Sequence, residues 1–284
     1  MPKKPTYRGR FAPTPTGPLH LGSLVSAMAS YLEARTHQGS WYLRIDDLDH
    51  QRCRAGMADQ IIQSLHNLGF CWQSPIYYQQ QHLSHYQDAI DYLRQRSLVY
   101  ACDCSRQRLR ATPHYLGTCR TLGKPDTPGH ALRVRTDKTP QQNLNHQGSA
   151  KASGDFIIRR RDGIIAYQLA VVIDDQLAQI TDVVRGADLL DSTARQNYLQ
   201  QLLGYPIPTY RHVPLVMGSD GKKLSKSAAA EPIGHSQPLA DLCTAWHFLQ
   251  PRKPPSTLHT VADFWDWALI HWQPKMLALS SKLG

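Results

Sequence analysis

The apolar residues near the N-terminus predict a strand, a helix and a second strand. Residues 7–13 form a short predicted strand that runs into a turn-rich loop, and residues 41–46 form the second. Between them, helical spacing begins near His20 or Leu21, and Gly39 stands just past the predicted end. This order predicts a β-α-β unit with parallel strands and a right-handed crossover. The apolar face of the helix consists of Leu21, Val25, Met28 and Leu32.

Helical and strand-like patterns alternate along much of the remaining chain. A helix that contains Met57 is closed by Gly69. Ser84 and Gln87 have the spacing of a capping box, which predicts a helix through about Arg96. Apolar, β-branched patterning returns at residues 156–158, 164–173 and 180–184, followed by a predicted helix at 192–203, a predicted strand at 210–217 and a Trp-rich helical tail.

Residues 102–154 differ in composition from the segments around them. They are rich in Cys, Arg, Thr, Pro, Gly, Asn and Gln, and contain one predicted short strand at 131–135. Long stretches without regular structure are uncommon inside compact domains, so residues 102–154 are interpreted as an insertion that is stabilised by its own cross-link. The chain as a whole is predicted to be α/β.

The chain carries an excess of basic residues. Its 284 residues include 32 Lys and Arg against 22 Asp and Glu, a net charge of +10, and 41% are apolar, which is typical of a folded protein. The excess indicates a polyanionic partner such as RNA, DNA or an anionic membrane, or else ordinary solvated surface charge. No obligate protein partner is evident.

Membrane residence and export are not expected. The most apolar stretch, residues 163–173, is too short to span a bilayer and is interrupted by Gln168. The basic N-terminus runs into Tyr7-Arg8-Gly9-Arg10, where a signal peptide would have its apolar region. A cytoplasmic protein is therefore expected.

Three of the six cysteines crowd together at Cys102, Cys104 and Cys119. A chain with a large core has little need of disulfides, so this spacing favours a metal site. Thiolates suit zinc in a closed structural site. The alternative is three free thiols in a loop.

The turn-rich loop after the first strand ends in Leu19-His20-Leu21-Gly22-Ser23 at the predicted helix N-terminus. Such a terminus presents N–H groups and the positive end of the helix dipole, which suit a phosphate chain. His20 can donate to phosphate oxygens, and Gly22 leaves room for a nucleotide against the backbone. The alternative is a capped helix with an incidental histidine.

A second candidate lies at residues 218–227, which combine Gly, Ser and Asp with three lysines. A mobile basic loop can close over a triphosphate and neutralise charge that develops there. A solvated basic loop is the commoner explanation for an isolated lysine cluster. The two segments together, in this order, are more specific than either alone.

His20-Leu21-Gly22-Ser23 and Lys223-Leu224-Ser225-Lys226-Ser227 resemble the two signature motifs of class I aminoacyl-tRNA synthetases. Further strings are similar to those of glutamyl-tRNA synthetases, and the resemblance covers about three quarters of the chain. These strings are residues 10–17, Arg44-Ile45-Asp46-Asp47-Leu48-Asp49, Val172-Ile173-Asp174-Asp175 and Val184-Arg185-Gly186-Ala187-Asp188.

The resemblance implies a Rossmann-type parallel sheet with an inserted zinc-containing subdomain and a small C-terminal helical subdomain. The first half of the Rossmann core is expected at residues 1–98 and the second half at 178–217. The insertion, which resembles an acceptor-binding subdomain, is expected at 99–177, and the basic loop with the helical subdomain at 218–284.

The residues after Ser227 leave room for a small helical subdomain and not for an anticodon-binding domain. A glutamyl-type body of this size resembles the glutamyl-Q tRNA(Asp) synthetase family. That family activates L-glutamate with ATP and Mg without tRNA. It then transfers glutamate to the queuosine base at the wobble position of tRNA(Asp).

The resemblance also implies roles for individual residues. Arg10 would pair with the side-chain carboxylate of glutamate, for which a guanidinium fork has the right geometry. Asp46 stands where the family has Glu, which holds the α-ammonium group, so its reach is one methylene shorter. The remaining implied glutamate contacts are Ala12, Thr14, Tyr167 and Arg185. For Arg185 the alternative is a purely structural role, in which Asp182 or Asp188 holds the guanidinium.

The ATP site and the metal site are carried over in the same way. Tyr115 matches the family's fourth zinc ligand beside the three cysteines, and His114 is the more conventional alternative. The implied catalytic residues are His20 and Lys226, and the implied ATP-binding residues are His20, Gly22, Ser23, Lys223 and Lys226.

Three rival functions remain open. One is a truncated glutamyl-tRNA synthetase that charges a tRNA 3′ end. Another is a small nucleotidyltransferase of the same superfamily, which would need neither the glutamyl-type strings nor the cysteines. The third is a non-catalytic glutamate-binding or RNA-binding module.

Overall fold

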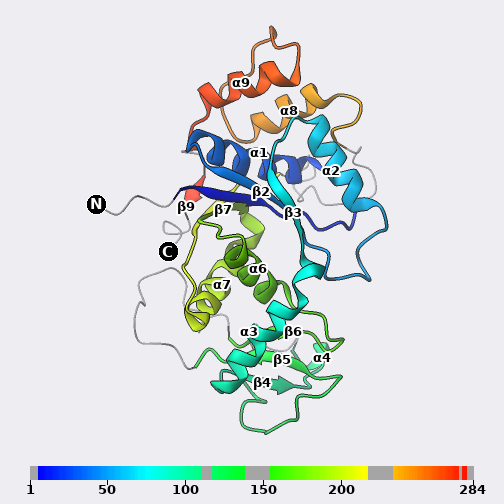
Figure 1. The fold of residues 1–284 in the computed structure, drawn as a ribbon, viewed down its shortest axis with the longest axis vertical. Helices are drawn as coiled ribbons and strands as arrows, with labels where there is room; N and C mark the ends of the chain where they lie inside the picture. The colour runs from blue at the N-terminus through cyan, green and yellow to red at the C-terminus, as the bar shows by residue number, and fades with distance from the viewer. Residues whose placement is uncertain are drawn as a thin grey trace, which may run out of the picture. The chain divides into compact units, whose positions relative to one another are not determined.

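The computed structural model describes residues 6–109, 115, 117–137, 154–216, 233–274 and 277–279. The chain divides into two compact units (Figure 1). The core unit combines residues 1–79, 180–190 and 208–280, and the cysteine unit combines residues 80–179, 191–207 and 281–284. The four-segment division derived from the resemblance stays a prediction.

The core unit is built on parallel strands. β1 (Arg8–Phe11), β2 (Ser40–Ile45) and β3 (Gln73–Tyr78) pair in parallel, in the order β1-β2-β3. β7 (Asp182–Gly186) and β8 (Thr209–Val213) are also parallel, and β9 (Ala278–Leu279) joins β8 in the antiparallel direction.

Two hydrogen bonds between Arg8 and Thr181, the residue before β7, place β7 beside β1. The N–H of Thr181 donates to the carbonyl of Arg8 at 3.0 Å, and the N–H of Arg8 donates to Oγ1 of Thr181 at 2.9 Å. The first strand is therefore flanked by β2 on one side and by β7 on the other. This arrangement is that of a Rossmann-type α/β domain, as the sequence predicts.

Helices α1 (Leu21–Thr36) and α2 (Met57–Asn67) lie on one side of the β1-β2-β3 sheet in Figure 1. Helices α8 (Pro238–His247) and α9 (Val261–His271) lie beyond α1 on the same side and pack against that helix. Thr260 begins α9 with a capping box: its hydroxyl accepts from the N–H of Asp263, whose carboxylate accepts from the N–H of Thr260. The predicted helices in these segments are confirmed.

An aromatic cluster holds α9 against the first helices. Nε1 of Trp265 donates to the carbonyl of Leu68 at 2.8 Å, and the Tyr31 and Trp265 rings meet edge to face at 4.9 Å. Gly69 adopts a φ of +75°, and a Cβ there would lie 2.6 Å from Cγ1 of Val261. Any other residue at position 69 would adopt a strained backbone conformation and would press against the side chains of Val261 and Trp265.

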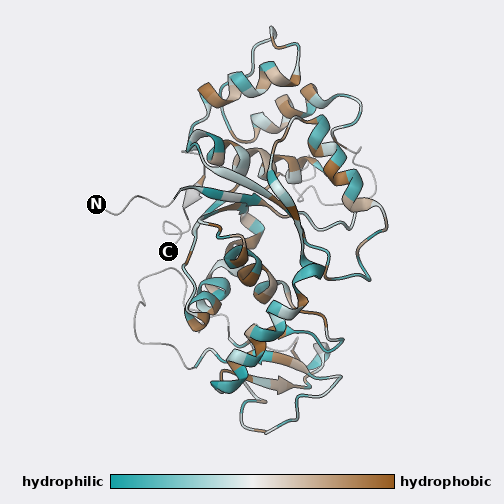
Figure 2. Ribbon diagram, viewed as in Figure 1, coloured by the Kyte–Doolittle hydropathy of each residue, from teal (hydrophilic) through white to brown (hydrophobic). Residues whose placement is uncertain are grey.

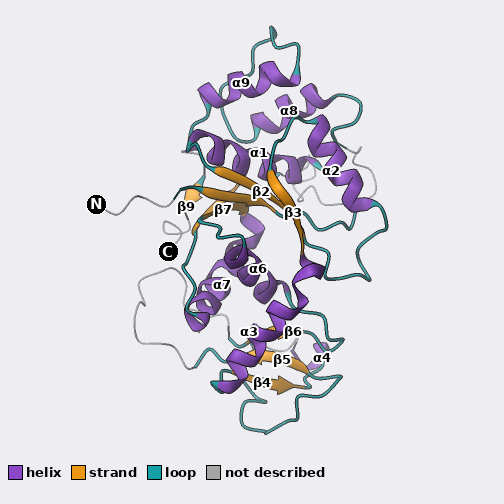
Figure 3. Ribbon diagram, viewed as in Figure 1, coloured by secondary structure: helices purple, strands orange, loops and turns teal. Residues whose placement is uncertain are grey.

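The cysteine unit contains an antiparallel sheet, shown in orange in Figure 3. The order is β4-β5-β6, with β4 at Val99–Cys102, β5 at Ala131–Val134 and β6 at Phe156–Arg159. The described helices of this part of the chain are α3 (Leu83–Gln95), α4 (Arg106–Leu109), α6 (Tyr167–Leu177) and α7 (Leu190–Leu203). A short 3-10 helix at Gln79–His82 leads into α3, and a second one at Ala187–Leu189 belongs to the core unit.

The predicted capping box at Ser84 is wrong. Helix α3 begins at Leu83, directly after a 3-10 helix, so Ser84 lies inside the helix. The N-cap residue is His82, and its side chain makes no capping hydrogen bond. The β-branched run at 164–173 lies mostly in helix α6, which is largely brown in Figure 2. A buried helix that is apolar on most faces has the same composition as a buried strand.

Strands β3, β4 and β9 were not predicted. β3 begins with the polar residues Gln73 and Ser74 followed by Pro75, β4 is four residues long, and β9 is two residues long. Among the described helices, none has the length and apolar character that crossing a membrane requires.

Candidate active site

The N-terminus of α1 is organised by His20. His20 is the N-cap, with extended backbone angles, and its carbonyl accepts from the N–H of Leu24 at 3.0 Å. Ser23 contacts both ring nitrogens: its N–H donates to Nδ1 at 3.3 Å, and its Oγ lies 3.1 Å from Nε2. His20 therefore caps the helix, and Gly22 and Ser23 lie half-buried in the first turn beside it.

The loop between β1 and α1 is tied to the segment after β2. The carbonyl of Pro13 accepts from the N–H of Asp46 at 3.0 Å, and the carbonyl of Pro15 accepts from the N–H of Arg54 at 2.9 Å. Thr14 accepts from the N–H of Thr16 at 2.8 Å, which tightens the turn. These bonds fix the path of the chain into the N-terminus of α1.

Buried polar side chains occur on or just after the parallel strands of the core unit. Arg10 in β1 is 5% exposed, Arg185 in β7 is 5% exposed, and Asp46 directly after β2 is 7% exposed. Ala12 and Thr14, after β1, are half-buried. Ligands of Rossmann-type sheets bind at the carboxyl ends of the strands, so this is the expected edge for a substrate.

Asp46 is held by a neighbouring arginine. Nε of Arg44 donates to Oδ1 of Asp46 at 2.7 Å, and both side chains are buried. Buried charges are costly unless they are paired and hydrogen-bonded. The Asp46 carboxylate is thus fixed from within β2, a relationship that the sequence reasoning missed.

Arg185 is held by groups from the neighbouring strand and the following turn. Its Nε donates to Nε2 of His212 at 3.4 Å, one of its terminal nitrogens donates to the carbonyl of Leu189 at 3.2 Å, and its guanidinium lies 4.9 Å from the Tyr210 ring centroid. Asp182, one of the two expected structural partners, binds Arg211 at 3.2 Å.

Tyr167 belongs to the cysteine unit, where it begins α6 and is partly exposed. Two carboxylates of the same helix, Asp174 and Asp175, are buried. Oδ1 of Asp174 lies 2.8 Å from Nδ1 of His82 and accepts from the hydroxyl of Tyr86 at 2.7 Å. The Asp174 carboxylate thereby anchors α6 to the start of α3.

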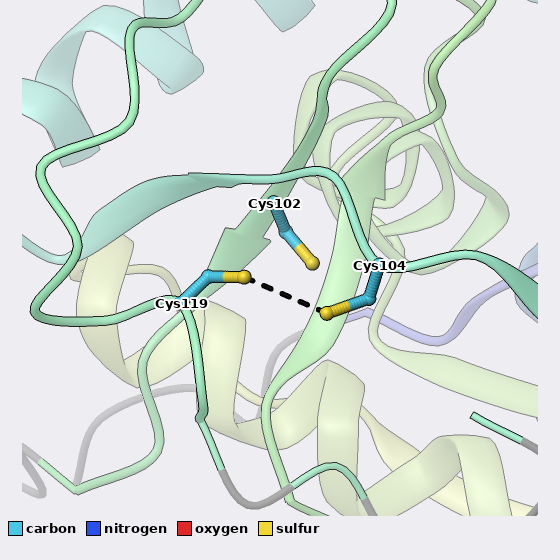
Figure 4. Close-up of side chains that lie close together, drawn as sticks. All are labelled: Cys102, Cys104 and Cys119. Atoms are coloured by element: carbon cyan, nitrogen blue, oxygen red, sulfur yellow. Dashed lines mark hydrogen bonds between the residues drawn. The ribbon is translucent and has the colours of Figure 1, made fainter. Parts of the chain in front are cut away.

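Figure 4 shows the sulfur atoms of Cys102, Cys104 and Cys119 pointing toward one another. All three lie within 4.8 Å of each other, and the sulfurs of Cys104 and Cys119 are 3.5 Å apart. The Tyr115 hydroxyl lies 3.6 Å from the sulfur of Cys102 and 3.8 Å from that of Cys104. It also accepts from the N–H of Cys119 at 2.8 Å.

These separations fit a tetrahedral metal ion. With Zn–S distances of about 2.3 Å, a tetrahedral ion separates its sulfur ligands by about 3.8 Å. The three cysteines and Tyr115 therefore offer four donors around one point, and all four side chains are buried. His114, the alternative fourth ligand, lies outside the described residues.

Arg133 supplies positive charge beside the cluster. Burial acts to raise the pKa of the Cys102 thiol, but the backbone N–H of Cys104, the Tyr115 hydroxyl and the Arg133 guanidinium lower that pKa to about 7. Burial raises the pKa of Cys104. The guanidinium of Arg133 also lies 4.0 Å from the Tyr115 ring centroid. A cluster with anionic ligands is stabilised by such a neighbour.

Asp155 ties the cysteine-bearing loop to the sheet, and the sequence reasoning missed it. Its carboxylate accepts two bonds from Arg120, each 2.5 Å long, and others from the Tyr100 hydroxyl and from the N–H and hydroxyl of Thr136. Its own N–H donates to the carbonyl of Tyr115 at 3.1 Å. Because Arg120 directly follows Cys119, the Asp155 carboxylate positions the loop that carries this candidate metal ligand. The sequence feature that could have indicated Asp155 is its position directly before the apolar segment at residues 156–158.

The basic loop at 218–227, including Lys223 and Lys226, lies outside the described residues. Its role toward ATP stays a prediction.

Comparison with known proteins identifies the family. Residues 6–233 match tRNA synthetases class I (E and Q), catalytic domain. Glutamyl-Q tRNA(Asp) synthetase of Verminephrobacter eiseniae is 46% identical, over 95% of this chain and 98% of the relative. The proteins of that name from Aromatoleum aromaticum and Pseudomonas syringae pv. tomato are 43% and 44% identical, over 94% and 97% of this chain and 89% and 96% of their own lengths.

The chain belongs to the glutamyl-Q tRNA(Asp) synthetase family. The resemblance found in the sequence is thereby confirmed.

Solved structures agree with the fold of this family. Glutamate-tRNA synthetase from Elizabethkingia anophelis superposes with a TM-score of 0.68 and 27% identity, over 78% of this chain. A glutamate tRNA ligase from Elizabethkingia meningosepticum superposes with a TM-score of 0.65 and the same identity. The chain spans about half the length of these two enzymes, 52% of each.

Proposed function

We propose that this chain is a ligase that activates L-glutamate with ATP, without tRNA, and transfers glutamate to the queuosine base at the wobble position of tRNA(Asp). The observation that carries the proposal is the match to relatives named glutamyl-Q tRNA(Asp) synthetase over nearly the whole of both chains. ATP and tRNA are cytoplasmic molecules, so the proposed place of action is the cytoplasm.

In the first step, the α-carboxylate of glutamate attacks the α-phosphorus of ATP in line, and pyrophosphate leaves. Negative charge builds on the phosphates, where the N-terminus of α1, His20 and Lys226 would stabilise it. Mg²⁺ bound to ATP would neutralise part of that charge. Gly22, Ser23 and Lys223 would complete the ATP site.

Glutamate would be recognised by charges of both signs. Arg10 would pair with its side-chain carboxylate, and Asp46 would hold its α-ammonium group. The burial of both side chains supports these roles, because a charge shielded from water binds its counter-charge more strongly. The remaining proposed glutamate contacts are Ala12, Thr14, Tyr167 and Arg185.

In the second step, a hydroxyl of the modified nucleoside attacks the carbonyl carbon of glutamyl-adenylate. An ester bond forms, the bond to the phosphate oxygen breaks, and AMP leaves. No residue is assigned as a general base, and positioning of the two reactants would supply much of the rate.

The metal would be one structural zinc ion held by Cys102, Cys104, Cys119 and Tyr115. The donor set and the sulfur–sulfur distance of 3.5 Å support zinc over hard cations, which prefer oxygen ligands. Such an ion would hold the loop that carries Cys104, Tyr115 and Cys119 against the β4-β5-β6 sheet. It would take no part in the reaction.

The proposal is tested by glutamate-dependent ATP–pyrophosphate exchange without tRNA, followed by transfer of labelled glutamate to tRNA(Asp) with and without queuosine. Exchange together with queuosine-dependent labelling supports it. Label on the terminal adenosine would instead identify a truncated glutamyl-tRNA synthetase. Absence of exchange would leave a non-catalytic binding module.

A further inference from the structure

The backbone of Tyr115, the oxygen donor of the cysteine cluster, is fixed by the two residues that precede β6. The N–H of Asp155 donates to the carbonyl of Tyr115 at 3.1 Å, and Tyr115 forms an isolated bridge with Gly154. Gly154 adopts a φ of +66°, and a Cβ there would lie 2.5 Å from the carbonyl oxygen of Tyr115. Only glycine permits so close an approach of the two backbones.

The ring of Tyr115 is held separately, by a buried arginine. The guanidinium carbon of Arg133 lies 4.0 Å from the centroid of the ring, and the Arg133 side chain is only 4% exposed. One of its terminal nitrogens donates to the carbonyl of Asp155 at 2.9 Å. Arg133 therefore contacts both the ring and the residue that binds the backbone of Tyr115. A guanidinium stacked on an aromatic face binds it more strongly when water is excluded.

The position of Arg133 in the sheet suits it to this task. β5 is the central strand of β4-β5-β6, and its register with β4 pairs Arg133 with Tyr100 and Ala131 with Cys102. Paired residues share a face of a sheet, and so do residues two apart on one strand. Arg133 and Cys102 therefore lie on the same face, and a central strand holds a side chain more rigidly than a loop does.

The orientation of the ring decides where its hydroxyl lies. The hydroxyl is 3.6 Å from the sulfur of Cys102 and 3.8 Å from that of Cys104, where it would complete a set of four donors. A tyrosine that turned away would leave this position to water. Residues that orient metal ligands in this way typically change metal affinity by about ten- to one-hundred-fold.

We propose that Arg133 is a positioning residue of the metal site: it holds the Tyr115 ring so that the tyrosine oxygen, and not water, is the fourth donor, and it thereby slows release of the ion. This inference rests on the proposed zinc site and does not depend on the proposed reaction.

A second route from Arg133 to the metal would run through Cys102, because the same guanidinium lowers the pKa of that thiol. A double-mutant cycle separates the two routes. If Arg133 acts through Tyr115, its replacement has no further effect once the tyrosine oxygen is gone. If it acts through Cys102, the two effects multiply.

The test measures how fast the zinc-loaded full chain releases its ion to an excess of the chelator pyridylazoresorcinol, followed by absorbance. Tyr115→Phe and Arg133→Met should each release zinc about ten- to one-hundred-fold faster than the unaltered chain. The double variant should release it no faster than Tyr115→Phe alone. Multiplied effects in the double variant would overturn the proposal.

Two further replacements of Arg133 separate positioning from general support of the sheet. Arg133→Lys should recover most of the slow release, because an ammonium group can also lie over the ring. Arg133→Gln keeps a donor for the Asp155 carbonyl but loses the charge, so it should release zinc about as fast as Arg133→Met. It takes the place of Arg133→Met in the cycle if the methionine variant does not fold.

Val134→Ala is the matched control, because Val134 is the next residue of β5, is buried, and points to the other face of the sheet. It should lower the melting temperature and leave zinc release unchanged. Equal acceleration in Val134→Ala, or unchanged release in Arg133→Gln or in Tyr115→Phe, overturns the positioning role alone. An unaltered chain that binds no zinc overturns the metal site and this inference together, whereas the proposed reaction is judged separately by glutamate-dependent exchange.

Discussion

Nε of Arg44 lies 2.7 Å from Oδ1 of Asp46, and both side chains are buried at the end of β2. The contact fixes the position of the Asp46 carboxylate. A carboxylate that is already oriented by a neighbouring arginine loses less freedom on binding a ligand.

Asp46→Asn should destabilise the chain and weaken glutamate binding together. Removing one charge of a buried pair costs about 3 to 5 kcal/mol, so the free energy of unfolding should fall by about that amount in denaturant titrations. The matched control is Asp59→Asn on the exposed first turn of α2, which should cost about 0.5 kcal/mol. Equal losses in the two variants would contradict the buried pair.

His20→Asn separates helix capping from phosphate binding. Asparagine is a favoured N-cap residue, so the variant should keep its melting temperature, whereas His20→Ala should lose about 1 kcal/mol of stability. Both variants should reduce pyrophosphate exchange by about one-hundred-fold, because neither keeps the ring that stabilises phosphate charge. Full exchange activity in His20→Asn would show that the histidine serves only as a cap.

Cys104→Ser should lower both zinc content and stability. A hydroxyl is a poor replacement for a thiolate, so bound zinc, measured by elemental analysis after gel filtration, should fall well below one ion per chain. Cys71→Ser is the control, because Cys71 is exposed and lies in the core unit. Unchanged zinc and stability in Cys104→Ser would refute the metal site.

Asp155→Asn should remove a part of the acid dependence of stability. The largest influence on the pKa of Asp155 is burial, which raises it, but bonds from Arg120, Tyr100 and Thr136 outweigh burial and hold the pKa below its usual value. A carboxyl group with a lowered folded-state pKa stabilises the fold above its unfolded pKa of about 3.9, and this contribution disappears as pH falls through the folded value.

The measurement is urea unfolding of both proteins between neutral pH and pH 3. At neutral pH the variant should be less stable by about 3 kcal/mol, the cost of leaving Arg120 without its carboxylate. The gap should narrow below about pH 4. A gap that stays constant with pH would mean that the carboxylate charge contributes nothing.

Much of the fold and part of the candidate site could be predicted from patterns of residues that lie close together in the chain. The helix at His20 and the three clustered cysteines were predicted because each depends on residues close together in the chain. The α6 helix was harder, because its apolar residues carry no helical stripe when most of its faces are buried.

The contacts that hold buried arginine side chains could not be predicted from neighbouring residues in the sequence. Arg185 and His212 are 27 positions apart and meet only through the register of β7 and β8. The bonds between Asp155 and Arg120 likewise depend on how a loop returns to the sheet. Such contacts follow from tertiary packing, which neither spacing nor composition encodes.

The pairing of β9 with β8 has a consequence for synthesis of the protein. The core unit is interrupted by the cysteine unit, and its last described strand lies at residues 278–279. On the ribosome, β1, α1 and β2 emerge early but must wait for β7, β8 and finally β9 before the sheet is complete. Shortening the chain before residue 278 would leave the backbone of β8 open to pairing with another molecule, so aggregation would be the expected fate of such a fragment.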